Sequence, residues 1–236
     1  MKLRIYIYLL AIVTVVCISC DSQKKAKPDV YDLAKLSSHI YDPDKHEDFS
    51  KNLTLEDFSE STLGVTASTY GNEYYKVIVF RGTNNFFDGV ADVGLVLSHL
   101  FDNDSDDDNP LNVITDISSA FLTNKVNQTI SYYKLAKIGE TRTVIITGHS
   151  LGGFLAQIAG YISGDETHTF NAPGAYQYIT EKNIDSAKNV NITNHLSQDI
   201  VSKFGQHAGK KIIYEHASHS IDEFCEFLKK EYEGKL

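Results

Sequence analysis

The chain has 236 residues, which suits a single domain, and 42% of them are hydrophobic, which is enough for a sizeable core. Its formal net charge is −9 at pH 7. This charge argues against a nucleic-acid-binding protein, which needs a basic face, and against simple electrostatic attraction to anionic lipid.

The first twenty residues have the pattern of a secretory signal peptide. A short basic start is followed by an apolar run from Ile5 to Ile18 and by polar residues from Asp21 onward. The apolar run is too short to span a bilayer comfortably. A small residue, Ser19, directly before Cys20 resembles the end of a bacterial lipoprotein signal, in which the cysteine becomes the first mature residue and carries acyl chains.

We therefore expect residues 1–20 to be a lipoprotein-type signal peptide with cleavage before Cys20, residues 21–28 to be a linker and residues 29–236 to be the folded domain. The protein is then exported and held by its lipid anchor on a membrane, facing the periplasm or at the cell surface. Ordinary secretory cleavage, which would give a secreted protein, and an uncleaved anchor are the alternatives. Cys225 has no partner cysteine in the domain, so the fold should not depend on a disulfide, and no Cys/His spacing indicates a metal site.

Strand and helix patterns alternate along the folded domain. Asp29 can cap a first helix, and Gly71-Asn72 between two β-rich runs is a hairpin signal. Val77–Phe80 is apolar at every position, which predicts a central strand buried on both sides. The alternation predicts a mostly parallel sheet. In chain order the expected elements are a helix at 29–41, a short helical turn at 53–58, hairpin strands at 63–70 and 73–80, a helix at 120–138, a strand at 143–147, a helix from 153, a strand at 167–171, a helix at 175–187, strands at 190–196 and 212–214, and a helix at 221–232.

The run from Gly148 to Gly152, Gly-His-Ser-Leu-Gly, is the most informative stretch of the chain. A β-branched strand pattern precedes it and a helical pattern follows it. Gly-x-Ser-x-Gly on a strand-to-helix turn is typical of a nucleophile elbow, which presents Ser150 Oγ at a helix N-terminus. Glycines at both ends let the strand and the helix cross closely. An ordinary glycine-rich turn is the alternative interpretation.

A serine nucleophile needs a base to take its proton and an acid to orient that base. In this architecture the order along the chain is Ser, then Asp or Glu, then His. Asp199 follows a predicted strand, where a loop carboxylate can point at the site. The base must follow Asp199 on a loop, which leaves His207, His216 and His219 as candidates.

Five motifs with characteristic spacing lie along the chain. They are Val79-Phe80-Arg81-Gly82-Thr83, Thr147-Gly148-His149-Ser150-Leu151-Gly152-Gly153, Phe170-Asn171-Ala172-Pro173-Gly174, Asp199-Ile200-Val201 and His219-Ser220-Ile221-Asp222. In this order they resemble the motifs of class 3 (fungal-type) lipases and their bacterial lipase-like relatives. The resemblance covers residues 29–236 and implies an α/β-hydrolase fold, with a mostly parallel central sheet flanked by helices.

The resemblance also assigns roles to individual residues. Ser150 is the nucleophile, Asp199 orients the base, and His219 is the base. Only twenty positions separate Asp199 and His219, which is shorter than in the fungal enzymes. His216 and His207 are therefore kept as alternatives for the base.

The oxyanion hole is likewise implied by the resemblance. The Thr or Ser that follows Phe-Arg-Gly in this family supplies it, so Thr83 and Leu151 are expected to donate backbone N–H groups to the oxyanion. Gly148, His149 and Gly152 are expected to support the elbow, with His149 as a structural hydrogen-bonding residue rather than the base.

The segment 84–112 is the least regular part of the chain. Its apolar stretch 86–101 follows the oxyanion strand, where this family often has a lid, so we expect either a lid over the site or a buried core helix. The acidic run 102–108 lacks the central Gly and final Glu of an EF-hand, and it is expected to be a solvated loop, with a weak cation site as the alternative.

These features predict a serine hydrolase that cleaves carboxylic esters of lipids through an acyl-enzyme, as a lipase, esterase or phospholipase, with no metal or organic cofactor. Its expected partners are a lipid or other ester and the membrane that holds its anchor, with no nucleic acid and no obligatory protein partner. An acyltransferase or thioesterase on the same triad is one alternative. A non-catalytic lipase-like surface binding protein is the other.

Overall fold

The computed structural model describes residues 26–44, 49, 52–61, 65–82, 111–216 and 218–233. The expected signal peptide, Thr83, the apolar stretch 86–101 and the acidic run 102–108 lie outside these residues. Within the described part of the chain, no helix combines the length and the apolar character needed to cross a bilayer.

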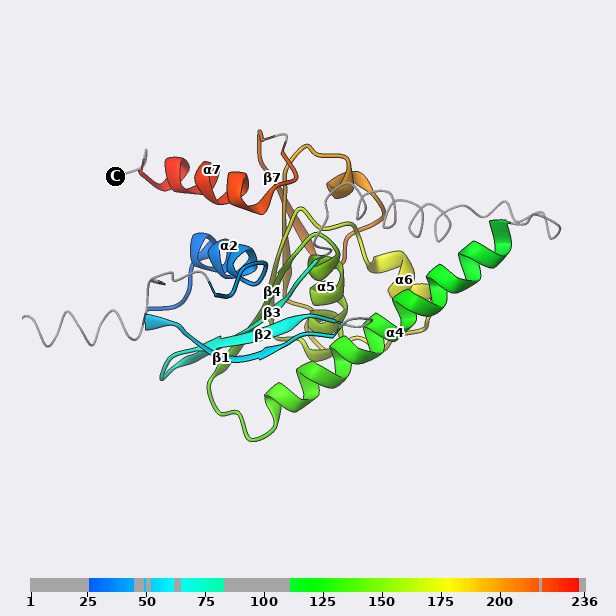
Figure 1. Ribbon diagram of the computed structural model, residues 1–236, viewed down its shortest axis with the longest axis horizontal. Coiled ribbons are helices and arrows are strands. Elements are labelled where there is room, and N and C mark those ends of the chain that lie inside the picture. The colour runs from blue at the N-terminus through cyan, green and yellow to red at the C-terminus, as the bar shows by residue number, and fades with distance from the viewer. Residues whose placement is uncertain are drawn as a thin grey trace, which may run out of the picture.

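A single seven-stranded sheet forms the centre of the molecule, with its strands in sequence order (Figure 1). The first three strands pair antiparallel, and every pair from β3 onward is parallel. The strands are β1 (Thr54–Ser59), β2 (Ala67–Gly71), β3 (Tyr75–Phe80), β4 (Thr143–His149), β5 (Glu166–Phe170), β6 (Ile192–Leu196) and β7 (Lys210–Ile213).

Helices cover both faces of this sheet (Figure 1). The helices α2 (Val30–His39) and α7 (Ile221–Glu233) pack together on one face. On the other face lie α4 (Leu111–Lys137), α5 (Leu151–Ser163) and α6 (Tyr176–Glu181). A mostly parallel sheet flanked by helices is the arrangement predicted from the sequence, and the α/β-hydrolase fold is confirmed.

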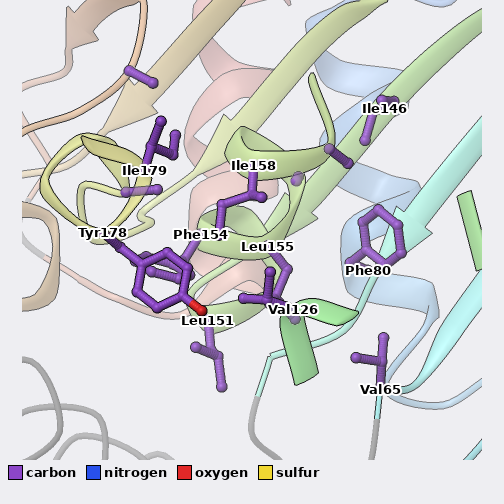
Figure 2. Packing of buried hydrophobic residues seen from close by; sticks show 14 of the residues in the cluster. Val65, Phe80, Val126, Ile146, Leu151, Phe154, Leu155, Ile158, Tyr178 and Ile179 are labelled. Carbon is purple, nitrogen blue, oxygen red and sulfur yellow. The ribbon is translucent and has the colours of Figure 1, made fainter. Parts of the chain in front are cut away.

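Strand β3 shows how one sheet supports two hydrophobic cores. Val77 and Val79 pack in the core beneath α2 and α7, whereas Ile78 and Phe80 pack in the core beneath α4 and α5. Successive side chains of a strand point to opposite faces, so a run that is apolar at every position is buried on both sides, as predicted. Figure 2 shows the second core, where side chains of α5 lie between Phe80 and Tyr178.

Residues 53–58 do not form the expected helical turn, because strand β1 occupies Thr54–Ser59. Tertiary partners override the local pattern here. The strand pairs with β2 through an irregularity at Glu56, whose carboxylate binds the Arg142 guanidinium. The neighbouring Asp57 accepts a 2.8 Å hydrogen bond from the Tyr132 hydroxyl of α4. An edge strand that exposes charged side chains lacks the hydrophobic alternation that would identify it in a sequence.

The other elements differ from expectation mainly at their ends. Asp29 caps α2, as predicted, by accepting a hydrogen bond from the Asp32 backbone N–H. Gly71 belongs to β2, so the hairpin turn begins at Asn72, whose side-chain oxygen accepts hydrogen bonds from two backbone N–H groups of the turn. The helix α4 begins at Leu111, well before the expected start at residue 120, and α6 stops at Glu181 rather than at residue 187.

A directed chain of hydrogen bonds crosses the sheet from β5 to the end of β7. His168 Nε2 donates to the Glu166 carboxylate, so its Nδ1 accepts from His195 Nε2, and His195 Nδ1 in turn accepts from the Tyr214 hydroxyl, with each pair separated by 2.9 Å. Burial lowers the pKa of His195 to about 3, and the proximity of Lys210 and of a second imidazole, His168, adds to this effect. Burial also lowers the pKa of His168, although its hydrogen bond to Glu166 acts in the opposite direction. Both rings are therefore neutral near pH 7.

These histidines make the stability of the fold sensitive to acid. In the unfolded chain a histidine binds its proton near pH 6.5, whereas the folded His195 does so only near pH 3, so the unfolded state takes up protons first as the pH falls. We expect His195 alone to lower the free energy of unfolding by about 2 kcal/mol between pH 7.5 and pH 5. Urea denaturation at both pH values measures this change, and the pH dependence should weaken by that amount in His195→Gln. An unchanged dependence in the variant would contradict the assignment.

Candidate active site

Ser150 lies at the turn from β4 into α5 with an unusual backbone conformation. Its φ of 58° and ψ of −129° fall in a region that residues with a side chain seldom adopt. Its backbone N–H donates a 3.0 Å hydrogen bond to the Phe170 carbonyl at the end of β5, and its carbonyl accepts from Gly153 and Phe154 in the first turn of α5. These bonds hold the strained residue on both sides, as a nucleophile elbow requires.

Two glycines allow the strand and the helix to cross at this turn. A Cβ on Gly148 would lie 2.5 Å from the carbonyl oxygen of Gly152. A Cβ on Gly152 would overlap the carbonyl oxygen of Phe80 at the end of β3. Any larger residue would therefore push α5 away from the ends of β3 and β4 and move Ser150.

The structure brings together the three residues of the expected triad. His219 Nε2 lies 3.0 Å from Ser150 Oγ, and His219 Nδ1 lies 2.9 Å from Asp199 Oδ1. The parallel strands explain this convergence. Ser150 follows β4, Asp199 follows β6 and His219 lies in the segment after β7, so all three lie at the edge formed by the carboxyl ends of these strands. All three residues are buried.

Asp199 accepts hydrogen bonds from five donors. Oδ1 accepts from the backbone N–H groups of Val201 and Ser202, at 2.8 and 3.1 Å, in addition to His219. Oδ2 accepts from the hydroxyls of Ser197 and Ser202. Burial by itself would raise the pKa of this carboxyl, but the hydrogen bonds from His219, Ser202 and Ser197 outweigh burial and lower the pKa to about 2. The carboxylate is therefore ionised near neutral pH.

Tyr41 and His149 form a second hydrogen-bonded chain beside the triad. His149 Nε2 lies 2.8 Å from the His219 carbonyl oxygen, which only accepts, so this nitrogen carries the proton. His149 Nδ1 then accepts from the Tyr41 hydroxyl at 2.9 Å, and the Tyr41 oxygen accepts from the Gly82 N–H at 3.1 Å. Burial lowers the pKa of His149 to about 3, so the ring is neutral. His149 supports the elbow in this arrangement, and its Nε2 is engaged with a carbonyl.

Asn171 connects the segments that carry Asp199 and His219. It has a positive φ of 45° at the end of β5. Its side-chain oxygen accepts a 2.8 Å hydrogen bond from the Ser197 N–H, and its amide nitrogen donates to the carbonyls of Ser218 and His219, at 3.2 and 3.3 Å. Asn171 thereby fixes the end of β6 relative to the loop that presents His219.

The other histidine candidates lie elsewhere. His207 Nε2 donates to the Ala172 carbonyl at 2.9 Å, and the ring of His216 stacks on Phe227 at a centroid distance of 5.2 Å. Leu151, expected in the oxyanion hole, directly follows Ser150 as the first residue of α5, and Thr83 lies outside the described residues. In the described ranges, no group of three or more His, Cys, Asp or Glu side chains is placed to hold a metal ion.

Sequence reasoning missed four residues of this site. Tyr41 has no sequence signal, because only the fold brings the segment after α2 beside Gly82. Asn171 lies within a motif of the family resemblance, and that motif was the one signal that could have identified it. Ser197 and Ser202, which flank Asp199 in the sequence, could not be told from ordinary loop serines.

The parallel sheet, the elbow and the buried Ser–His–Asp arrangement define a protein of the α/β-hydrolase class. The chain belongs to the phospholipase-like family described as the Tle-like phospholipase domain, whose sequence model matches residues 29–206. The expectation of a lipase-like family is thus confirmed.

The individual proteins that the chain resembles share 30% sequence identity with it or less. The chain is 30% identical over 119 residues to the extracellular phospholipase A1 of Serratia liquefaciens, an alignment that covers 50% of this chain and 30% of that protein, so the chain spans about a third of that relative's length. Among solved structures, it is similar to the Lip2 lipase from Yarrowia lipolytica, with a TM-score of 0.49, 16% identity and coverage of 78% and 76% of the two chains. A triacylglycerol lipase from Penicillium expansum matches with a TM-score of 0.46, 16% identity and coverage of 82% and 81%.

Replacing Tyr41 by Phe removes both the donor to His149 and the acceptor for the Gly82 N–H. We expect the kcat for a soluble ester to fall about tenfold with little change in KM, because the loss of about 1.4 kcal/mol of hydrogen bonding loosens the positions of His219 and of the strand that leads to Thr83.

Tyr132→Phe is the matched control. It also removes the hydroxyl of a partly buried tyrosine, one that donates to Asp57 of β1 and has no hydrogen bond to His149 or Gly82. Both variants should lose stability in urea denaturation, and only Tyr41→Phe should lose kcat. An equal loss of kcat in the two variants would mean that Tyr41 has a purely structural role.

Proposed function

We propose that this protein is a serine hydrolase that cleaves carboxylic ester bonds of lipids, with phospholipids as its substrate class. The observation that carries the proposal is the continuous hydrogen-bonded chain from Ser150 through His219 to Asp199 at a nucleophile elbow. Membership of the Tle-like phospholipase domain family supports the substrate class, as does the similarity to an extracellular phospholipase A1.

In the proposed reaction, Ser150 Oγ attacks the ester carbonyl carbon while His219 Nε2 takes the hydroxyl proton. The carbon–oxygen bond to the alcohol then breaks, and the alcohol leaves with the proton from His219. A water molecule, deprotonated by the same nitrogen, attacks the acyl-enzyme and releases the fatty acid and Ser150. The ionised Asp199 stabilises the positive charge that His219 acquires in each half of the reaction.

The developing oxyanion needs donors that are already in place. Leu151 is the first residue of α5, so its backbone N–H has no acceptor within the helix and is available to the oxyanion. Thr83 is the second proposed donor, and it directly follows Gly82, whose N–H is bound by Tyr41. The partial positive charge at the N-terminus of α5 favours the same negative charge.

A fluorophosphonate probe tests the nucleophile directly. We expect the probe to label Ser150, with loss of the label in Ser150→Ala and in His219→Ala. Ser150→Ala should lower kcat about a millionfold, and Asp199→Asn about ten-thousandfold, because the amide cannot stabilise the charged His219. Ser131→Ala, at an exposed serine of α4, is the control and should retain both label and activity. Label that persists in Ser150→Ala would exclude this assignment.

We further propose that the chain is exported, cleaved before Cys20 and anchored by acyl chains on that cysteine. The sequence pattern of residues 1–20 supports this, and the extracellular location named for the Serratia relative is consistent with export. We expect mass spectrometry of the mature protein to find acyl chains on Cys20. Cys20→Ala should lose both the acyl mass and cleavage at this position, whereas Cys17→Ala should retain them. A Cys20→Ala protein with wild-type mature mass in the membrane fraction would refute the anchor.

A further inference from the structure

A cationic and partly apolar surface surrounds the connection between β6 and β7. We define the β6–β7 surface by four exposed residues, Ile200, Lys203, Lys211 and Ile213. Two of its residues are aliphatic and two are lysines. Both lysines and Ile213 line a pocket of about 350 Å³, whose inner wall includes the buried Ser202 beside Asp199. The strand β7 is the outermost strand on one side of the sheet (Figure 1).

Neither lysine of this surface has a carboxylate partner among the described residues. Within that part of the chain, the side-chain ammonium groups of Lys203 and Lys211 form no hydrogen bond or ion pair, whereas those of Lys27, Lys76 and Lys137 each pair with a carboxylate. The carboxylate behind the pocket is Asp199, which is buried and already saturated by donors. The two ammonium groups at the pocket are therefore not neutralised by an ion pair with any residue that the structure describes, although the chain as a whole has a net charge of −9.

The aliphatic residues are the second component. Ile200 is 60% exposed and Ile213 is 66% exposed, although both are large and branched. Single exposed aliphatic residues are common on soluble proteins, but lysines beside exposed isoleucines are the combination that favours contact with the surface of an anionic bilayer.

The position of the β6–β7 surface is also informative. Ile200 directly follows Asp199, and Ile213 ends β7 shortly before the loop that carries His219. Both residues lie toward the carboxyl-terminal ends of parallel strands, at the edge of the sheet that presents Ser150. Contact of this surface with a bilayer would therefore bring the active-site edge of the sheet close to lipid.

We propose that the β6–β7 surface docks this protein on an anionic phospholipid bilayer, with a lipid phosphate held between Lys203 and Lys211 at the pocket. The proposal deepens the proposed function, on which its biological meaning rests, but docking itself needs no catalysis. Lysines on an edge strand can also serve only to prevent pairing with another chain, and this explanation predicts no dependence on lipid charge.

The experiment measures partitioning of the full-length Ser150→Ala protein, which leaves the vesicles intact. Sedimentation with phosphatidylcholine vesicles is compared with sedimentation with vesicles that contain 30% phosphatidylglycerol. The N-terminal segment is the same in every variant, so the change in this ratio from one variant to another isolates the contribution of the β6–β7 surface. Each lysine near an anionic surface contributes about 1 kcal/mol, which is about fivefold in partitioning. Lys203→Gln and Lys211→Gln should each lower the ratio about fivefold, and the double variant about 25-fold.

Lys188 and Val190 provide matched controls. Both are exposed, and both precede β6, at the opposite edge of the sheet from the site. Lys188→Gln should leave the ratio unchanged, and Val190→Ser should bind vesicles better than Ile213→Ser. Activity of these variants with an intact Ser150 on a soluble short-chain ester should equal that of the wild type, which separates failed docking from a failed serine hydrolase.

Three results would overturn the proposal. One is equal partitioning of the parent protein on the two kinds of vesicle. Another is an equal loss in Lys188→Gln and in the variants of the β6–β7 surface. The third is a dimer, detected by light scattering, that the surface variants dissociate without any change in vesicle binding, because the surface would then be an interface between two copies of the chain.

Discussion

At the turn from β4 into α5, the backbone of Gly148 lies against that of Gly152, and Gly152 lies against the Phe80 carbonyl at the end of β3. This close crossing forces Ser150 into its positive φ and presents its Oγ at the N-terminus of α5. The remaining parts of the site are arranged around it. Because dense packing leaves no room for a Cβ, the position of Ser150, the proposed nucleophile, follows from steric exclusion rather than from any single attractive contact.

His219, the proposed base, is positioned by hydrogen bonds instead. The loop that carries His219 is held through its backbone by His149 and Asn171, and the imidazole is held through its side chain by Asp199. The environment of Asp199 keeps it ionised, and burial keeps His149 neutral. Two histidines that are close in space thus have different electrostatic roles, because one ring faces a carboxylate and the other lies between a tyrosine hydroxyl and a carbonyl.

The charge of the molecule is unevenly distributed. The net charge of −9 argued against attraction to anionic lipid, but an average over the chain does not describe one surface. Several cationic side chains near the sheet form ion pairs, such as Arg142 with Glu56 and Glu140, and these pairs present little field to a partner. The ammonium groups of Lys203 and Lys211 lack such partners among the residues that the structure describes, and both lysines line the pocket that Ser202 also lines, next to Asp199.

By itself, the sequence determined the alternation of strands and helices, the doubly buried strand β3 and the elbow around Ser150, because each depends on spacing within a short segment. It reduced the base to three histidines but could not choose among them without a family resemblance. Only the tertiary structure decided that β1 is a strand, that Tyr41 binds Gly82 and His149, and that Asn171 joins β6 to the loop of His219. These features depend on contacts between residues that are far apart in the chain, and no local pattern of side chains encodes such contacts.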